Sequence, residues 1–332
     1  MKKILFPALL LLSIAQVAFS QKDITLDDCF TFFKFYPQPA PSYRFAPSGQ
    51  HYFTEEDGDI AEYHLLTGQQ TRYLVEKADL KAIGAWDDFQ FNADLSKVLL
   101  QTNTRPVYRH SVLADYWVFD RGARRAELLT DRDSVQFAAF SPDGRNVAFV
   151  AGNNLFFKNL ASGQTTQITT DGRKNHLING LPDWVYEEEF SPVESGGMTA
   201  TAWSPDGSKL AVIRFVESAV PKYPLQWYNN GLYPRYTDFK YPKVGAPNSK
   251  VSVHVYDLAT GQTTQAIPGT QEQDIYLPRI YWTPDNLLCV YVLNRPQDNL
   301  SLVLYDPARK ETGMLLTELD PAYVDLEVCD NL

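Results

Sequence analysis

Three adjacent carboxylates are the residues of this chain whose type and spacing most clearly suggest chemistry. Glu187, Glu188 and Glu189 follow directly after the aromatic residues Trp184 and Tyr186. Three like charges side by side repel one another, and aromatic neighbours that exclude water increase the cost of this repulsion. A bound cation would relieve it. The cluster therefore indicates a cation-binding site, and the alternative is an acidic turn exposed to water.

The elements that must position this cluster are β-strands. A short turn motif recurs along the chain, each time after an aromatic residue and before an alternating apolar stretch. Proline presets φ for the first central turn position, and Gly or Asn tolerates a positive φ, so each copy predicts a tight turn between two strands. The five copies are Phe45-Ala46-Pro47-Ser48-Gly49, Phe91-Asn92-Ala93-Asp94-Leu95, Phe140-Ser141-Pro142-Asp143-Gly144, Trp203-Ser204-Pro205-Asp206-Gly207 and Trp282-Thr283-Pro284-Asp285-Asn286.

A second recurring piece supports an all-β fold. Residues 61–66, 155–160 and 251–258 each read as a strand that is closed by a Gly-containing hairpin turn. The first three aromatic starts are 46 and 49 residues apart, the length of a four-stranded propeller blade. We therefore predict a β-propeller with about five blades present, and with insertions at about 171–197 and 217–248.

Two ring sizes are compatible with this repeat. Five blades can close into a complete ring, because propellers have four to eight. Alternatively, the five blades are part of a larger ring, because the pattern predicts the start of a further strand where the sequence stops at Leu332. We prefer the second interpretation. No stretch alternates strands with amphipathic helices, so no α/β-hydrolase sheet is predicted.

The N-terminus predicts export. Lys2 and Lys3 precede an apolar stretch that ends at Ala18-Phe19-Ser20, a pattern typical of a secretory signal peptide over residues 1–20; a membrane anchor is the alternative. We expect a periplasmic or extracellular protein without a membrane partner.

Charge and cysteine content narrow the possible partners. The net charge of -10 includes both signal lysines, so the remaining chain is more acidic still, which argues against a nucleic-acid partner. The three cysteines, Cys29, Cys289 and Cys329, lack metal-ligand spacing and are expected to be buried unpaired thiols. No metal or other cofactor is predicted.

Three ordered motifs resemble the propeller domain of the dipeptidyl peptidase IV family. They are Tyr108-Arg109-His110-Ser111, Asp183-Trp184-Val185-Tyr186-Glu187-Glu188-Glu189, and Tyr241-Pro242-Lys243-Val244-Gly245-Ala246-Pro247-Asn248. The resemblance covers essentially all of residues 21–332. It implies that the chain is the N-terminal part of an eight-bladed propeller. Such a propeller belongs to a serine exopeptidase, and this enzyme removes dipeptides of the Xaa-Pro type from free peptide N-termini.

The resemblance also implies roles for individual residues. Glu188 and Glu189 would bind the protonated α-amine of the substrate, and Arg109 would contact substrate carbonyl oxygens and pair with the glutamates in the empty site. The remaining motif residues would support them: Asp183, Trp184, Tyr186 and Glu187. We interpret His110 as structural. The resemblance further implies a homodimer contact through residues 217–248, although this segment could instead pack on its own propeller.

Cleavage in the resembled family needs a Gly-x-Ser-x-Gly elbow on a hydrolase domain, and this sequence contains none. We therefore expect no catalytic residue and no hydrolysis by this polypeptide alone. Two interpretations stay open. The chain is either the recognition part of an exopeptidase whose hydrolase domain is encoded separately, or a non-catalytic peptide-binding or scaffold propeller.

Overall fold

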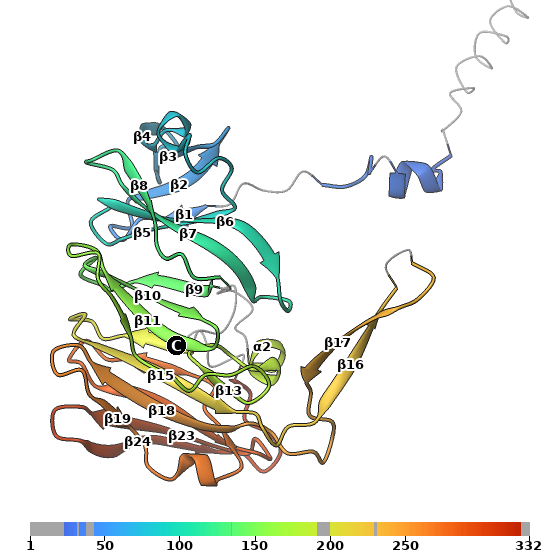
Figure 1. The fold of residues 1–332 in the computed structure, drawn as a ribbon, viewed down its shortest axis with the longest axis vertical. Coiled ribbons are helices and arrows are strands. Elements are labelled where there is room, and N and C mark those ends of the chain that lie inside the picture. The colour runs from blue at the N-terminus through green and yellow to red at the C-terminus, as the bar shows by residue number, and fades with distance from the viewer. Residues whose placement is uncertain are drawn as a thin grey trace, which may run out of the picture.

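Five antiparallel sheets form the body of the molecule and follow one another around an arc (Figure 1). The computed structural model describes residues 23–31, 33–37, 43–133, 135–190, 200–228 and 231–326. Each sheet is a blade, and neighbouring blades in the chain are neighbours in space. Blades 2 and 3 are joined at their edges by one strand pairing, Ala114 with Val135. The predicted β-propeller architecture is confirmed for these residues.

The first three blades have the simple order of a four-stranded meander, in which each strand pairs with the next. Blade 1 contains β1 (Arg44–Phe45), β2 (His51–Glu56), β3 (Asp59–His64) and β4 (Gln70–Val75). Blade 2 contains β5 (Asp88–Phe91), β6 (Lys97–Pro106), β7 (Val112–Asp120) and β8 (Arg125–Leu128). Blade 3 contains β9 (Val135–Phe140), β10 (Asn146–Ala151), β11 (Asn154–Asn159) and β12 (Thr165–Gln167).

The last two blades have an interrupted first strand. In blade 4, β13 (Leu177–Asn179) and β14 (Thr201–Trp203) both pair with β15 (Lys209–Val216), which is followed by β18 (Lys250–Asp257) and β19 (Thr263–Gln265). In blade 5, β20 (Ile275–Tyr276) and β21 (Ile280–Trp282) both pair with β22 (Leu288–Asn294), followed by β23 (Asn299–Asp306) and β24 (Glu311–Leu319).

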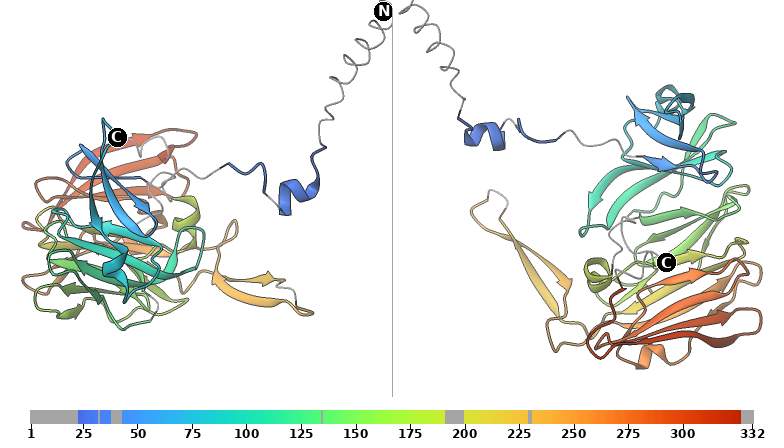
Figure 2. Two further views of the ribbon diagram at one scale, coloured as in Figure 1. Left: turned by 90° about the horizontal axis from the view of Figure 1, so that it is seen from above. Right: turned by 180° about the vertical axis from the view of Figure 1, so that it is seen from behind.

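Few elements lie outside the blades. A hairpin of β16 (Lys222–Trp227) and β17 (Arg235–Lys240) projects from blade 4, and we call it the hairpin arm (Figures 1 and 2). The helical elements are η1 (Asp27–Thr31), η2 (Lys77–Leu80), α2 (Trp184–Glu189) and η3 (Thr270–Glu272). No helix in the described part of the chain is long and apolar enough to cross a membrane.

All five predicted turns occur, each between the first and second full strands of a blade. The fifth residue of each motif donates its amide to the carbonyl of the second, at 2.8 to 3.1 Å. That fifth residue has a positive φ in every copy, and it is glycine in three copies and asparagine in one. Leu95 is the exception, with a φ of 58°, a conformation that is uncommon for a residue with a branched side chain.

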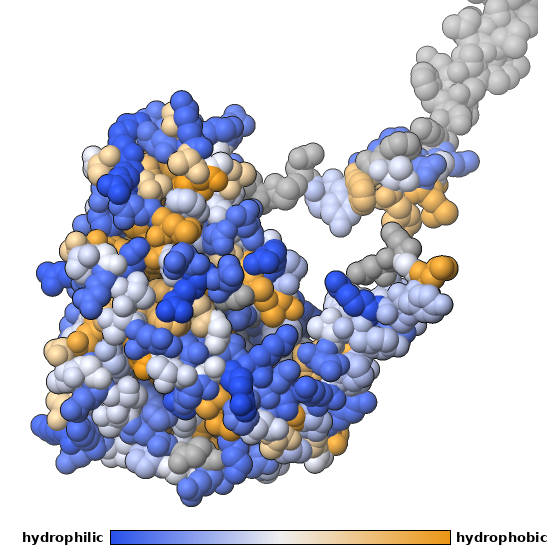
Figure 3. Space-filling model, in the orientation of Figure 1, coloured by the Kyte–Doolittle hydropathy of each residue, from blue (hydrophilic) through white to orange (hydrophobic). Residues whose placement is uncertain are grey.

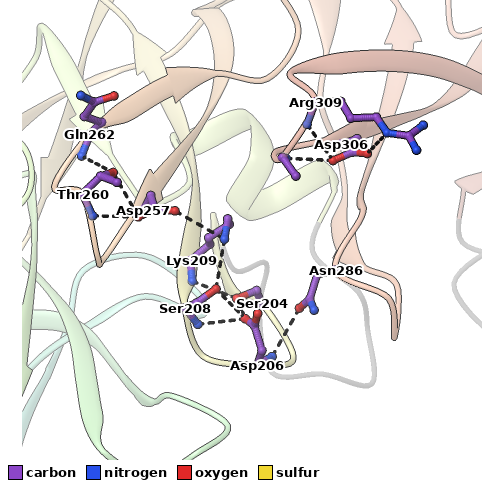
Figure 4. Close-up of polar contacts among 11 residues, drawn as sticks. Ser204, Asp206, Ser208, Lys209, Asp257, Thr260, Gln262, Asn286, Asp306 and Arg309 are labelled. Carbon is purple, nitrogen blue, oxygen red and sulfur yellow. Dashed lines mark hydrogen bonds and ion pairs between the residues drawn. The ribbon is translucent and has the colours of Figure 1, made fainter.

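Side-chain hydrogen bonds explain why Ser and Asp recur in these turns (Figure 4). In blade 4, Asp206 accepts hydrogen bonds from the hydroxyl of Ser204 at 2.6 Å and from the amide of Ser208 at 2.9 Å. The amide of Asp206 donates to the side chain of Asn286 in the corresponding turn of blade 5, at 3.4 Å. The turns thus close their own strands and also connect neighbouring blades.

The hydrophobic core is divided into four layers, one between each pair of successive blades. The alternation of side chains along a strand produces this division. In β10, Val147 and Phe149 pack toward blade 2, whereas Ala148 and Val150 pack toward blade 4. Because both faces of β10 are covered by a layer, this strand is buried at every position and reads as a nearly continuous apolar run. The outer surface is mostly hydrophilic (Figure 3).

Two sequence expectations need correction. The first insertion was placed at about 171–197, but β13 lies within that range and belongs to the sheet of blade 4. Cys289 is buried as expected, whereas Cys29 is only partly buried; both are free. The proposed signal peptide (residues 1–20) and Cys329 lie outside the described residues.

Candidate functional site

The acidic helix α2 fills the gap between β13 and β14, where the first strand of blade 4 is interrupted. Asp183 is its N-cap and accepts a hydrogen bond from the amide of Tyr186 at 3.0 Å. The other carboxylate oxygen of Asp183 accepts from the hydroxyl of Ser249 at 2.6 Å. Burial raises the pKa of Asp183, and the hydrogen bonds from Ser249 and Tyr186 partly oppose that increase. Asp183 therefore fixes where the helix begins.

Tyr186 anchors the helix in the core between blades 4 and 5. Its side chain is 1% exposed, and its ring contacts the rings of Phe190, Phe215 and Tyr276. Its hydroxyl accepts a hydrogen bond from the amide of Leu277 at 2.7 Å. Tyr186, which the sequence suggests as a supporting residue, thus packs into the core beneath the helix.

The three glutamates have three different surroundings. Glu187 is 1% exposed, and it accepts hydrogen bonds from the amides of His110 and Ser111 and from the Ser111 hydroxyl, at 2.7, 2.6 and 2.6 Å. Glu188 is mostly covered, with 14% of its side chain exposed. Glu189 is exposed. Only Glu188 and Glu189 are therefore accessible to a ligand, because the oxygens of Glu187 are occupied.

Arg109 reaches the acidic helix from another blade. It lies in the loop that joins β6 to β7 in blade 2, and its Nε is 3.2 Å from a carboxylate oxygen of Glu188. Its side chain is 72% exposed, so most of the guanidinium group faces solvent. Guanidinium nitrogens donate in a fixed planar fork that suits carbonyl and carboxylate oxygens. The structure thus brings Arg109, Glu188 and Glu189 to one place.

The third sequence motif also meets the helix. Trp184, which is partly exposed, stacks at a tilt on Tyr241 with ring centroids 4.2 Å apart, and it lies 6.1 Å from Phe239. Phe239 in turn lies 6.2 Å from the ring of Tyr108. These aromatic contacts join the base of the hairpin arm to α2 and to the Arg109 loop. All three motifs, far apart in sequence, converge here.

Sequence reasoning missed three residues of this region. Ser111 was part of a motif without an assigned role, and Ser249 follows directly after the third motif, so both positions were signalled. Glu217 was not signalled, because it is a single acidic residue in a broken segment. It is 6% exposed, and burial together with the nearby Asp183 raises its pKa to about 7, while Lys240 opposes the increase.

The described residues contain no group of three or more His, Cys, Asp or Glu side chains arranged to hold a metal ion. The guanidinium group of Arg109 forms an ion pair with Glu188. The observed chemistry is that of paired carboxylates with an adjacent arginine, a set that suits an organic cation next to a polar oxygen acceptor.

Fold and site together define a β-propeller that carries a short acidic helix in an interrupted strand and an arginine from a distant blade. Residues 92–331 match the family model for the dipeptidyl peptidase IV N-terminal region. The chain belongs to the dipeptidyl peptidase IV family.

Individual relatives agree with this assignment. A probable dipeptidyl-aminopeptidase B from Emericella nidulans is 37% identical over 253 residues, which are 70% of this chain and 27% of that protein. A probable dipeptidyl peptidase 4 from Trichophyton verrucosum is 33% identical over 277 residues, which are 80% of this chain and 36% of that protein. The chain thus spans about a third of the length of these relatives.

Solved structures show the same fold. The crystal structure of Porphyromonas gingivalis dipeptidyl peptidase 4 superimposes with a TM-score of 0.85 at 33% identity, covering 93% of this chain and 44% of that one. A putative dipeptidyl aminopeptidase IV from Bacteroides ovatus, at 21% identity and a TM-score of 0.63, shares the fold.

Proposed function

We propose that this chain recognises the free N-terminus of a peptide. Glu188 and Glu189 bind the protonated α-amine, and Arg109 donates to a carbonyl oxygen of the same peptide. The chain thereby supplies the substrate-recognition part of a dipeptidyl peptidase activity, the activity named for its relatives.

The observation that carries this proposal is the ion pair between Arg109 and Glu188. It joins a loop of blade 2 to a helix in blade 4, and Glu189, the next residue of that helix, is exposed and has no ion-pair partner among the described residues. An α-amine has a pKa near 8, so it is mostly protonated at neutral pH. Two carboxylates can then form charge-assisted hydrogen bonds with it, and Glu188 is sheltered enough to strengthen them.

The arrangement also explains selectivity for chain ends. An acetylated or internal peptide nitrogen carries no charge, and binding it would leave the two carboxylates without a cation. Leaving a desolvated charge unpaired typically costs about 2–5 kcal/mol in binding. The preference for Xaa-Pro peptides rests on the family resemblance and is part of the proposal, as is export of the chain to the periplasm or the outside.

The test is a calorimetric titration of the chain without residues 1–20 with Ala-Pro-Ala and with its N-acetylated form. We expect the free peptide to bind at least about tenfold more tightly than the acetylated one, a difference of about 1.4 kcal/mol or more. Glu188→Gln and Glu189→Gln should each abolish this preference, while the exposed control Glu311→Gln on β24 should keep it. Equal affinity for both peptides would disprove the proposal.

A further inference from the structure

The Arg109 loop reaches α2 because blade 2 has an unusually long central hairpin. Its strands β6 and β7 are ten and nine residues long, whereas the corresponding strands β10 and β11 of blade 3 are six residues each. The three or four extra residues extend the hairpin by about 10 Å at a strand rise near 3.3 Å per residue. The hairpin can thus pass blade 3 and contact a helix of blade 4.

A β-bulge bends this long hairpin. The pairing of β6 with β7 shifts register between Thr102 and Arg105, and Asn103 within the shift has a φ of 54°. Asn103 donates to Asp115 at 2.8 Å, and the amide of Thr104 donates to Asp87 at 3.0 Å. Bulges of this kind redirect a strand. The position of the hairpin beyond the bulge, and with it the position of Arg109, then depends on contacts at the tip of the hairpin.

Glu187 makes the strongest of these contacts. Both of its carboxylate oxygens are used, and all three donors belong to the two residues that follow Arg109. Two of these donors are backbone amides, so the contact fixes the course of the main chain directly after Arg109. A buried carboxylate with three hydrogen bonds from one loop is well suited to hold that loop.

We propose that Glu187 is a positioning residue that holds the tip of the β6–β7 hairpin on α2 and thereby places Arg109 beside Glu188. This inference rests on the proposed function for its consequence in peptide binding. Glu187 does not touch the peptide itself. It holds the β6–β7 hairpin of blade 2 against α2 of blade 4. Arg109 therefore contributes to binding only while the hydrogen bonds of Glu187 with His110 and Ser111 are made.

Amide hydrogen exchange tests the contact without any ligand. In Glu187→Ala we expect the amides of His110 and Ser111 to exchange at least about tenfold faster than in the unmodified chain. Amides in β15 should keep their exchange rates, which shows that the blade stays folded. Glu187→Gln should restore most of the protection, because its carbonyl oxygen can accept from the two amides and its NH2 group can donate to the Ser111 hydroxyl.

A double-mutant cycle on Ala-Pro-Ala affinity tests the consequence. Arg109→Ala and Glu187→Ala should each weaken binding by about tenfold, and the double variant by about tenfold rather than a hundredfold, since both remove the same contribution. Additive losses, or unchanged exchange at positions 110 and 111, would overturn the inference. If the unmodified chain does not bind the peptide while exchange responds as expected, the Glu187 contact stands and the proposed function falls.

Discussion

The two insertions of blade 4 both carry aromatic residues, but the side chains of these residues have opposite environments. The first carries α2, whose Tyr186 and Glu187 are each 1% exposed. The second is the hairpin arm, in which every residue of β16 is exposed, as are Tyr228, Leu232 and Tyr233 at 75%, 97% and 87%. In Figure 3 the arm stands away from the blades, and its surface is mostly pale, with a small hydrophobic area at its far end. Side chains of the first insertion are thus buried beneath the candidate site, whereas those of the second are exposed.

The neighbouring elements explain why α2 is buried and the hairpin arm is exposed. The helix occupies a gap in a sheet, so its buried side follows the core between two blades. Among the described residues, the arm is a sheet of only two strands, β16 and β17, and every residue of β16 is exposed. Its base alone is held, through the contacts of Tyr241 and Phe239 with Trp184. The comparison therefore predicts that substitutions in α2 change folding stability, whereas substitutions in the arm change association.

The largest expected effect is on stability, from truncation of one tyrosine in each insertion. Tyr186→Ala should lower the free energy of unfolding by about 3–5 kcal/mol, because it leaves a large cavity in the core. Tyr233→Ala in the arm should change it by no more than about 0.5 kcal/mol. Urea denaturation followed by tryptophan fluorescence measures both. Similar losses for the two variants would contradict the comparison.

The next effect concerns self-association. A homodimer contact through residues 217–248 stays a prediction, and the exposed end of the arm is where we expect it. Leu232→Glu should weaken the dimer by about 2 kcal/mol, roughly thirtyfold in Kd, because it places a charge in an apolar contact. Sedimentation velocity across a concentration series measures this change. A monomeric unmodified chain at all concentrations would show that the arm serves another purpose.

The smallest expected effect is a pH dependence of stability that comes from Glu217. This residue begins the second insertion and lies close enough to Asp183 of the first insertion for that carboxylate to raise its pKa. Its pKa is raised from 4.5 to about 7, so its contribution to stability is fully present below pH 4.5 and is lost as the pH rises through 7. After a discount for partial solvent screening, we expect a loss of about 1–2 kcal/mol over this range. Glu217→Gln should remove that loss and be more stable than the unmodified chain at pH 8.

The comparison of Glu217→Gln with the unmodified chain is essential for this prediction, because another group titrates in the same range. Burial lowers the pKa of His254 to about 4, so its contribution to stability increases as the pH rises from 4 to 6.5. Only the difference between the two proteins isolates Glu217. A difference that does not vary with pH would contradict the assigned pKa.

The sequence predicted the repeated parts of the fold well. Four of the five turn motifs combine a proline, a Ser or Thr and a residue with positive φ, all of which act locally, so they identify their blades without tertiary information. Leu95 shows the limit, since its turn forms although its residue type does not favour the conformation. The N-cap at Asp183 was also predictable, because capping depends on a few adjacent residues.

The site was only partly predictable. Its residues could be named from the three motifs, but the separate surroundings of Glu187, Glu188 and Glu189 depend on which way a short helix faces. That orientation is set by the burial of Tyr186 between two blades. Glu217 enters through packing of segments distant in sequence, and no local pattern specifies such a contact.

The central claim is tested most directly by a crystal structure of this chain with Ala-Pro-Ala bound. We expect the α-amine of the peptide within hydrogen-bond distance of both Glu188 and Glu189, and a peptide carbonyl oxygen within reach of Arg109. A peptide bound with its amine elsewhere, or a carboxylate pair that remains empty at saturating peptide, would contradict the account.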